Sequence, residues 1–120
     1  LLAGDSSIWY ESGACRDVTI RGNVFSNCCT SARSHGFCKG VISICPTVKD
    51  LGGQREPYHR NVRIIGNDFF TFDVPLLYAR SATNVVFDAN RVVRNSDYPG
   101  WGEPEIVSSV PVLKADGQRR

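Results

Sequence analysis

A repeated pattern constrains this sequence more than any other feature. Each copy begins with Asn or Asp followed by Val, alternates apolar residues, and reaches a second Asn just before another apolar run. The copies occupy residues 17–25, 61–69 and 84–92. A repeat at a fixed period is typical of folds in which equivalent units stack on one another, so it predicts the architecture directly.

Each copy predicts a short strand, a tight turn and a second strand, with no helical spacing between them. The interval from Asp17 to Asn61 is about twice that from Asn61 to Asn84, which we interpret as one period enlarged by insertions. A chain that winds in this way pairs each strand with its equivalent one turn away. The sequence therefore predicts an all-β parallel β-helix, a solenoid of about 3–4 rungs.

Three turn asparagines, Asn23, Asn67 and Asn90, occupy equivalent positions in the copies. Asn tolerates a left-handed backbone, and its side-chain amide both donates and accepts hydrogen bonds. We expect the three amides to stack in one column along the coil. The alternative is that they are ordinary turn residues.

A further sheet is expected from segments 4–13, 41–45 and 75–81. The predicted inward positions are Ile8, Tyr10, Ile42, Ile44, Leu77 and Ala79. The predicted outward positions are Trp9, Glu11, Ser43, Cys45, Tyr78 and Arg80. Strand parity places each set on one face of the sheet.

Two insertions, at about residues 29–40 and 46–60, flank the middle strand of that sheet. We expect them to form the walls of a shallow groove. Residues 1–95 are predicted to form the rungs, and residues 96–120 a capping segment and tail. Within this tail, 106–113 is expected to be a last strand and 114–120 to be frayed. Because the chain starts at Leu1-Leu2-Ala3 without a leader-like stretch, we expect it to be part of a longer protein.

Composition excludes several classes of function. Hydrophobic residues make up 42% and charged residues 22%, with a net charge of +2, which is typical of a globular domain. Without a polybasic run or an aromatic ladder, the sequence predicts no nucleic-acid partner. The apolar runs are too short to span a membrane.

Five cysteines, Cys15, Cys28, Cys29, Cys38 and Cys45, lie in the first half of the chain. A disulfide from Cys28 or Cys29 to Cys38 is one prediction, and thiols stacked inside the coil are the preferred one for the others. No Cys-x-x-Cys pair is present, so the spacing of His35 and Cys38 alone predicts no metal site.

The outer face of the predicted sheet combines aromatic and polar side chains, as sugar-binding clefts do. Trp9 is the candidate stacking platform, or alternatively packs under a loop. The candidate substrate contacts are Asp5, Trp9, Glu11, Ser43, Tyr78, Arg80 and His59. His35 and His59 are expected in loops. Asp5 and Glu11 lie roughly 20 Å apart in an extended strand, too far for the acid and base of one inverting site.

These residues resemble a known family. Gly4-Asp5-Ser6-Ser7-Ile8 is similar to the Gly-Asp-Asp-x-Ile strand of polygalacturonase-type hydrolases. Residues 9–13, 41–46 and 72–79 resemble more closely the C-terminal coils of the α-1,3-galactosidases, right-handed parallel β-helix enzymes that degrade blood-group B antigen. Ser6 replaces the second aspartate, and the family's aspartate pair lies in an earlier coil that this sequence lacks.

The resemblance implies the C-terminal coils of a secreted or periplasmic, inverting glycoside hydrolase that removes terminal α-1,3-linked galactose. It implies no cofactor and no catalytic residue in this chain, which alone is expected to be inactive. Expected partners are a galactose-terminated glycan, the remainder of the parent β-helix, and a second copy bound at an open end of the coil. The alternatives are a non-catalytic glycan-binding or adhesin segment, and a structural spacer.

Overall fold

The computed structural model describes residues 1–3, 13–28, 39–46, 56–72, 74–95 and 106–120, and within these ranges it contains strands and no helix. No helix in these ranges is therefore long and apolar enough to cross a membrane. The strands are β1 (Arg16–Arg21), β2 (Val24–Ser26), β3 (Ile42–Ile44), β4 (His59–Ile65), β5 (Asp68–Thr71), β6 (Leu77–Ala79), β7 (Ala82–Asp88), β8 (Arg91–Arg94), β9 (Ile106–Ser108) and β10 (Val112–Leu113).

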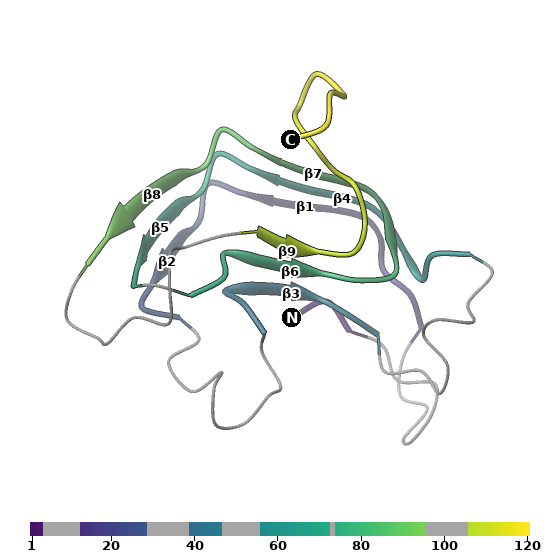
Figure 1. Cartoon of the computed structure of the whole chain (residues 1–120), viewed down its shortest axis with the longest axis horizontal. Helices are drawn as coiled ribbons and strands as arrows, with labels where there is room; N and C mark the ends of the chain where they lie inside the picture. The colour runs from purple at the N-terminus through teal and green to yellow at the C-terminus, as the bar shows by residue number, and fades with distance from the viewer. Residues whose placement is uncertain (4–12, 29–38, 47–55, 73, 96–105) are drawn as a thin grey trace.

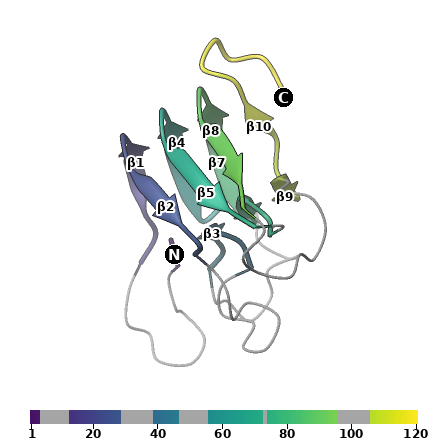
Figure 2. The ribbon, with the colours of Figure 1, turned by 90° about the vertical axis from the view of Figure 1, so that its left-hand side faces the viewer.

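The strands form three parallel sheets that the chain visits in turn (Figure 1). Their orders are β1-β4-β7-β10, β2-β5-β8 and β3-β6-β9. The chain thus returns to the same sheet at every third strand, and each strand pairs in parallel with its equivalent in the next repeat. Figure 2 shows the repeats side by side along the stack. The fold is all-β with parallel sheets, an arrangement compatible with the predicted β-helix.

The predicted alignment of β3 with β6 is confirmed. Ile42 lies opposite Leu77, Ser43 opposite Tyr78, and Ile44 opposite Ala79. On the other side of β3, Leu2 lies opposite Ile44, where the prediction had placed Tyr10. The Leu2 N–H donates to the Ser43 carbonyl at 2.7 Å, so that position of the sheet belongs to Leu2. The predicted strand around Ile8 lies outside the described residues.

The core fills the space between the three sheets. Alternation along β4 buries Val62 and Ile64 completely, as expected for a strand with one inward face. Phe25 and Phe69 occupy equivalent positions and their rings stack, with centroids 5.0 Å apart. The tilted ring of Phe87, from the neighbouring sheet, lies 5.9 Å from that of Phe69. Aromatic packing therefore links both successive repeats and adjacent sheets.

The predicted asparagine column is confirmed. Asn67 Oδ1 accepts hydrogen bonds from Asn23 N and Nδ2 at 3.0 and 3.1 Å. Asn90 Oδ1 accepts from Asn67 N and Nδ2 in the same way, at 2.9 and 3.1 Å. We call these three residues the asparagine ladder. They are not the left-handed residues, because the positive φ lies one position earlier, at Gly22, Gly66 and Ala89.

A second ladder marks a corner of the first sheet. Asp17, Asn61 and Asn84 have φ of 57°, 56° and 54°, and they interrupt the in/out alternation of β1, β4 and β7. Asn61 Nδ2 donates to Asp17 Oδ1 at 2.8 Å, and Asn84 Nδ2 donates to Asn61 Oδ1 at 2.9 Å. The residue that opens each sequence repeat therefore sets this bend.

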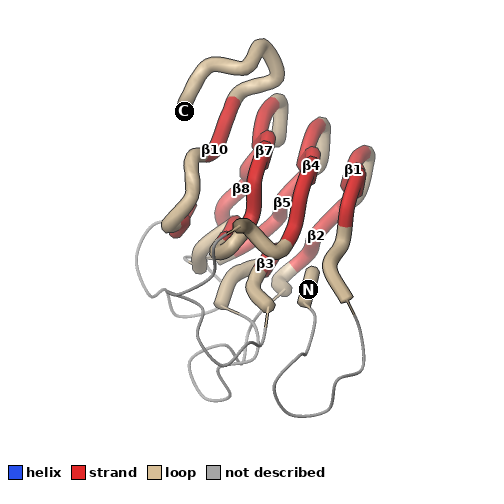
Figure 3. The backbone as a smooth tube through the Cα atoms, turned by 90° about the vertical axis from the view of Figure 1, so that its right-hand side faces the viewer, coloured by secondary structure: helices blue, strands red, loops and turns tan. Residues whose placement is uncertain are grey.

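The C-terminal residues continue the sheets. The predicted single strand over 106–113 is two strands, because β9 pairs with β6 and β10 pairs with β7. The prediction that residues 114–120 are frayed is wrong. Arg120 N donates to the Val112 carbonyl at 2.9 Å, and Arg120 Nη1 donates to the Phe87 carbonyl at 2.7 Å. Figure 3 shows this turn folding back above β10.

Cys15, Cys28 and Cys45 are free and partly exposed. The predicted disulfide from Cys28 to Cys38 is therefore wrong. The three thiols are also not stacked in the core. The alternative pairing of Cys29 with Cys38 lies outside the described residues. The predicted division of the chain at residue 95 stays a prediction.

Candidate functional site

Four of the seven predicted substrate contacts can be placed. Asp5, Trp9 and Glu11 lie outside the described residues. The structure describes Ser43, His59, Tyr78 and Arg80, which occupy three different strands or their ends. Only two of the four lie together on an accessible surface.

Tyr78 and Arg80 form that pair. Both side chains point outward from β6, as predicted, because the intervening Ala79 is fully buried. The Arg80 guanidinium carbon lies 5.5 Å from the centroid of the Tyr78 ring. The Arg80 backbone is held by a 2.8 Å hydrogen bond from its N–H to the Ile44 carbonyl. A partly exposed aromatic plane beside a cation is suited to a sugar, with the ring against C–H groups and the guanidinium on hydroxyls.

Ser43 is not an outward contact. It has the outward register of Tyr78, but its side chain is buried because residues 39–40 fold over it. Ser43 Oγ accepts hydrogen bonds from the N–H groups of Lys39 and Gly40 at 3.0 and 3.2 Å. A hydroxyl used in this way stabilises a turn and is not free to bind substrate.

Gly40 brings this turn against the strand that carries Tyr78. A Cβ at Gly40 would lie 2.9 Å from the Pro75 carbonyl oxygen and 3.3 Å from the Tyr78 nitrogen. Such distances are shorter than ordinary van der Waals contact, so the close approach requires glycine. The turn at 39–40 therefore borders the Tyr78–Arg80 surface. The rest of the two predicted groove walls, residues 29–38 and 47–55, lies outside the described residues.

His59 is not in a loop. It begins β4, where it lies opposite Ala82, and its side chain is fully buried. His59 Nδ1 accepts a 3.0 Å hydrogen bond from the Cys15 N–H, so the ring proton resides on Nε2. Nε2 is buried without a hydrogen-bond partner. Burial lowers the pKa of His59 from its ordinary value, which keeps the ring neutral. The expected loop position is therefore wrong, and a role of His59 in substrate contact stays a prediction.

The carboxylates of the described residues are all engaged. Asp17 accepts from Asn61, Glu56 pairs with Arg60 at 2.7 Å, and Asp116 accepts from the Gln118 N–H.

Two further carboxylates have lowered pKa values. A hydrogen bond from Arg91 lowers the pKa of Asp68, and hydrogen bonds from the N–H groups of Ala115 and Ala89 lower that of Asp88. A glycosidase general acid needs the opposite shift. Neither Asp68 nor Asp88 therefore has the environment of a general acid.

One hollow in the described part of the molecule lies by the last strands. It is lined by Ile106, Ser108, Val110, Pro111, Val112, Arg119 and Arg120. None of the predicted contacts lines it. The described residues also contain no group of three or more His, Cys, Asp or Glu arranged to hold a metal ion.

Comparison with curated proteins identifies the source of this sequence pattern. An α-1,3-galactosidase B of Akkermansia muciniphila is 53% identical over 103 residues, which cover 86% of this chain and 13% of the relative. The chain matches one region of the α-1,3-galactosidases. The resemblance noted from the sequence is thereby confirmed.

Other α-1,3-galactosidases match over similar ranges. Form B of Bacteroides thetaiotaomicron is 47% identical over 98 residues, covering 82% of the chain and 16% of the relative. Form A of Bacteroides fragilis is 42% identical over 107 residues, which cover 88% of this chain and 17% of the relative. The chain thus spans about a sixth or less of the length of these relatives. No protein-family model matches the chain.

Sequence reasoning missed the turn that buries Ser43 and the strand that contains His59. The Lys39-Gly40 pair before β3 was the available signal for the first, because glycine permits close backbone approach. His59 and Arg60 directly precede the Asn61 repeat and align with Ala82 and Thr83 of the next copy. The repeat extends further upstream than its apolar residues indicate.

Proposed function

We propose that this chain is the C-terminal β-helix region of a glycoside hydrolase that cleaves terminal α-1,3-linked galactose with inversion. The observation that carries the proposal is the 53% identity over 103 residues to an α-1,3-galactosidase B. Identity at this level over most of the chain supports a shared fold and a shared parent activity. The parent protein is proposed to be secreted or periplasmic.

The fold proposed for this region is a right-handed parallel β-helix. Its support is the cyclic order of the strands over three parallel sheets, together with the two amide ladders that link equivalent positions. Stacked rungs of this type present one long outer surface. The region would contribute part of that surface to the parent enzyme.

The proposed contribution is a wall of the galactose cleft built around Tyr78 and Arg80. The guanidinium carbon lies 5.5 Å from the ring centroid, so both groups face the same surface. Trp9, Glu11 and Asp5 remain proposed contacts on the preceding strand segment. The catalytic acid and base are proposed to lie in the parent chain outside these 120 residues.

Hydrolysis assays test the proposal. The full parent protein and the 120-residue chain are incubated separately with an oligosaccharide that ends in α-1,3-linked galactose, and the released sugar is followed by NMR. The parent is expected to release galactose first as the β-anomer, because inversion requires direct attack by water. The 120-residue chain is expected to release none. A first product of α configuration, or no release by the parent, would overturn the mechanism or the activity respectively.

A glycan-binding segment without hydrolysis is the second candidate. The exposed Tyr78–Arg80 pair favours it, since binding needs no carboxylate pair. A parent protein that binds the oligosaccharide and leaves it intact would support this alternative over the hydrolase.

A further inference from the structure

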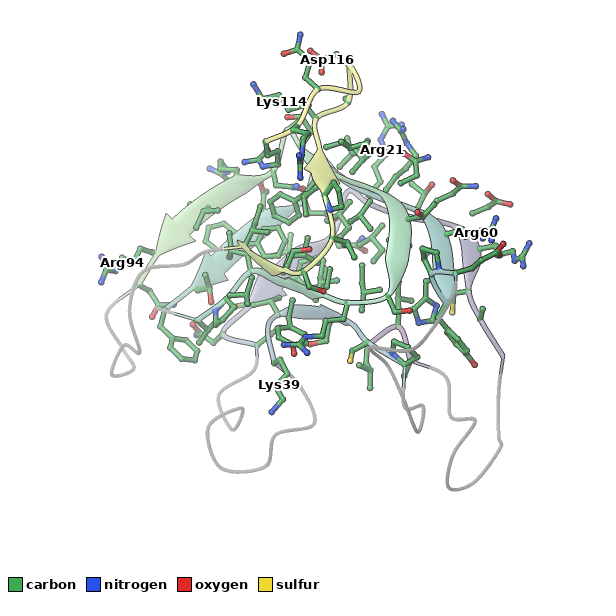
Figure 4. The ribbon with its side chains drawn as sticks, turned by 45° about the vertical axis from the view of Figure 1, so that its right-hand side comes forward. Arg21, Lys39, Arg60, Arg94, Lys114 and Asp116 are labelled. Atoms are coloured by element: carbon green, nitrogen blue, oxygen red, sulfur yellow. The ribbon has the colours of Figure 1, made fainter. Side chains whose placement is uncertain are left out.

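Four arginines lie on the outer face of β1 and β4. Arg16 and Arg60 occupy opposite register positions on the two strands. Arg63 lies between two fully buried residues of β4 and therefore faces outward, as does Arg21 at the end of β1. Figure 4 shows Arg21 and Arg60 projecting away from the molecule on the same side, whereas Lys39 and Arg94 project from other sides. We call Arg16, Arg21, Arg60 and Arg63 the arginine face.

Among the described residues, the neighbours of this face do not neutralise its positive charge. Glu56 pairs with Arg60 at 2.7 Å, and Asp17 accepts a hydrogen bond from Asn61 at 2.8 Å. Among the described residues, Arg16, Arg21 and Arg63 take part in no ion pair. The four cations thus exceed the two adjacent carboxylates, and three guanidinium groups keep all their hydrogen-bond donors available.

The shape and chemistry of the face select its partner. Guanidinium groups bind sulfate and carboxylate through two parallel hydrogen bonds. The other described outward residues of β1 and β4 are Asp17, Thr19, Asn61 and Ile65. The face therefore has no aromatic ring on which a nucleic-acid base could stack. Its charges lie on two adjacent strands, on both sides of the bend at Asp17 and Asn61, so a polyanion long enough to reach both parts fits the face better than a compact ligand.

We propose that the arginine face binds a sulfated polysaccharide. The choice of a polysaccharide over another polyanion rests on the proposed function, since the relatives are named as galactosidases. Sulfate esters on a glycan would contact the arginines while the Thr19 hydroxyl bonds to sugar oxygens. This surface is distinct from the Tyr78–Arg80 pair, which lies on the sheet formed by β3, β6 and β9.

Titration of the 120-residue chain with dextran sulfate tests the proposal, with uncharged dextran of equal length as the reference ligand. We expect binding to dextran sulfate only, and a steep loss of affinity as salt is raised. The double substitution Arg16→Ala with Arg63→Ala is expected to weaken binding about tenfold. The charge-matched control, Lys39→Ala with Arg94→Ala, is expected to weaken it less than about twofold. Arg16→Lys with Arg63→Lys should give an intermediate affinity.

Two outcomes overturn the proposal. Equal losses in the test and control pairs would show that net charge, and not this face, governs binding. Binding of duplex DNA at least as tight as that of dextran sulfate, and equally sensitive to the test pair, would assign the face to nucleic acid. Circular dichroism of each variant establishes that it is folded before titration. Galactose release by the parent protein is measured independently, so failure of either proposal is seen separately.

Discussion

At the scale of single residues, Asn67 connects three repeats. Its Oδ1 accepts two hydrogen bonds from Asn23. Its Nδ2 donates to the Ile20 carbonyl at 2.9 Å. Its backbone N–H and its Nδ2 both donate to Asn90 Oδ1. The side chain is almost completely buried. A buried polar group is favourable only when its bonds are made, so removing this amide leaves several groups on its neighbours unpaired.

Asn67→Ala is expected to lower the free energy of unfolding by about 2–4 kcal/mol, because a buried donor and a buried acceptor each lose their partner. The matched control, Asn23→Ala, removes the exposed end of the same ladder and is expected to cost about 1 kcal/mol or less. Urea denaturation of the 120-residue chain measures both. Equal losses for the two variants would contradict a special role for the central amide.

The buried imidazole of His59 makes stability depend on pH. Its pKa is lowered by burial in the folded protein, so the unfolded chain binds the proton more readily. Stability should be complete above the ordinary histidine pKa of about 6.5 and should fall as pH decreases below it. Thermal unfolding between pH 7.5 and 5 measures this loss.

Substitution identifies the group responsible for that loss. His59→Asn places Oδ1 where Nδ1 accepts from the Cys15 N–H, and it removes the titration. We expect this variant to lose less stability on acidification than the parent sequence. His35→Asn removes the other histidine of the chain and should leave the acid loss unchanged. The reverse result for the two variants would rule out His59 as the titrating group.

At the scale of elements, the turn before β3 links stability to the Tyr78 surface. Gly40→Ala would place a Cβ 2.9 Å from the Pro75 oxygen and is expected to cost about 1–3 kcal/mol. The added methyl group should also displace the strand that contains Tyr78 and thereby weaken binding of a galactose-terminated oligosaccharide. Gly13→Ala is the control, since its Cβ would meet no atom within 4 Å. Urea denaturation measures the free energy of unfolding of both variants, and calorimetric titration measures their affinity for the oligosaccharide.

Direct removal of the ring tests the same surface. Tyr78→Ala is expected to weaken oligosaccharide binding about tenfold, because the partly exposed aromatic ring is proposed to supply the apolar contact with the sugar. Val107→Ala, which changes the residue opposite Tyr78 on β9, is expected to have a much smaller effect. Identical affinities for the two variants would remove Tyr78 from the proposed cleft.

How far the sequence predicts each element depends on how local its determinants are. Asn23, Asn67 and Asn90 were predictable as a column because the repeat states their equivalence, and the register of Ile42 with Leu77 followed from strand parity. The burial of Ser43 was not predictable in this way, because it depends on a turn from outside the repeat. The strand character of His59 was hidden because buried histidine gives no apolar signal.

At the scale of the whole molecule, β1 and β2 are the terminal members of their sheets among the described strands. Among the described strands, β1 pairs only with β4 and β2 only with β5, so one edge of each has no strand neighbour. Val24 on β2 is 62% exposed. Unpaired edges with apolar side chains favour association between chains.

The isolated 120-residue chain is therefore expected to self-associate at this end as concentration rises. Val24→Lys should shift the equilibrium toward monomer, because a charge on an edge strand opposes pairing. Thr83→Lys places the same charge at an exposed position of β7, which has a strand on each side, and should have little effect. Sedimentation velocity over a range of concentrations distinguishes these results. A strictly monomeric parent sequence would refute the prediction.

The asparagine ladder has a consequence for how such a protein diversifies. The bond from Asn23 to Asn67 joins residues 44 apart in sequence, whereas that from Asn67 to Asn90 joins residues 23 apart, yet the N–H to Oδ1 distances are 3.0 and 2.9 Å. The column thus aligns successive turns of the chain, and its hydrogen bonds do not depend on the length of the peptide between them. Evolution, or a protein engineer, can graft a segment of new length between two ladder positions and leave the scaffold intact.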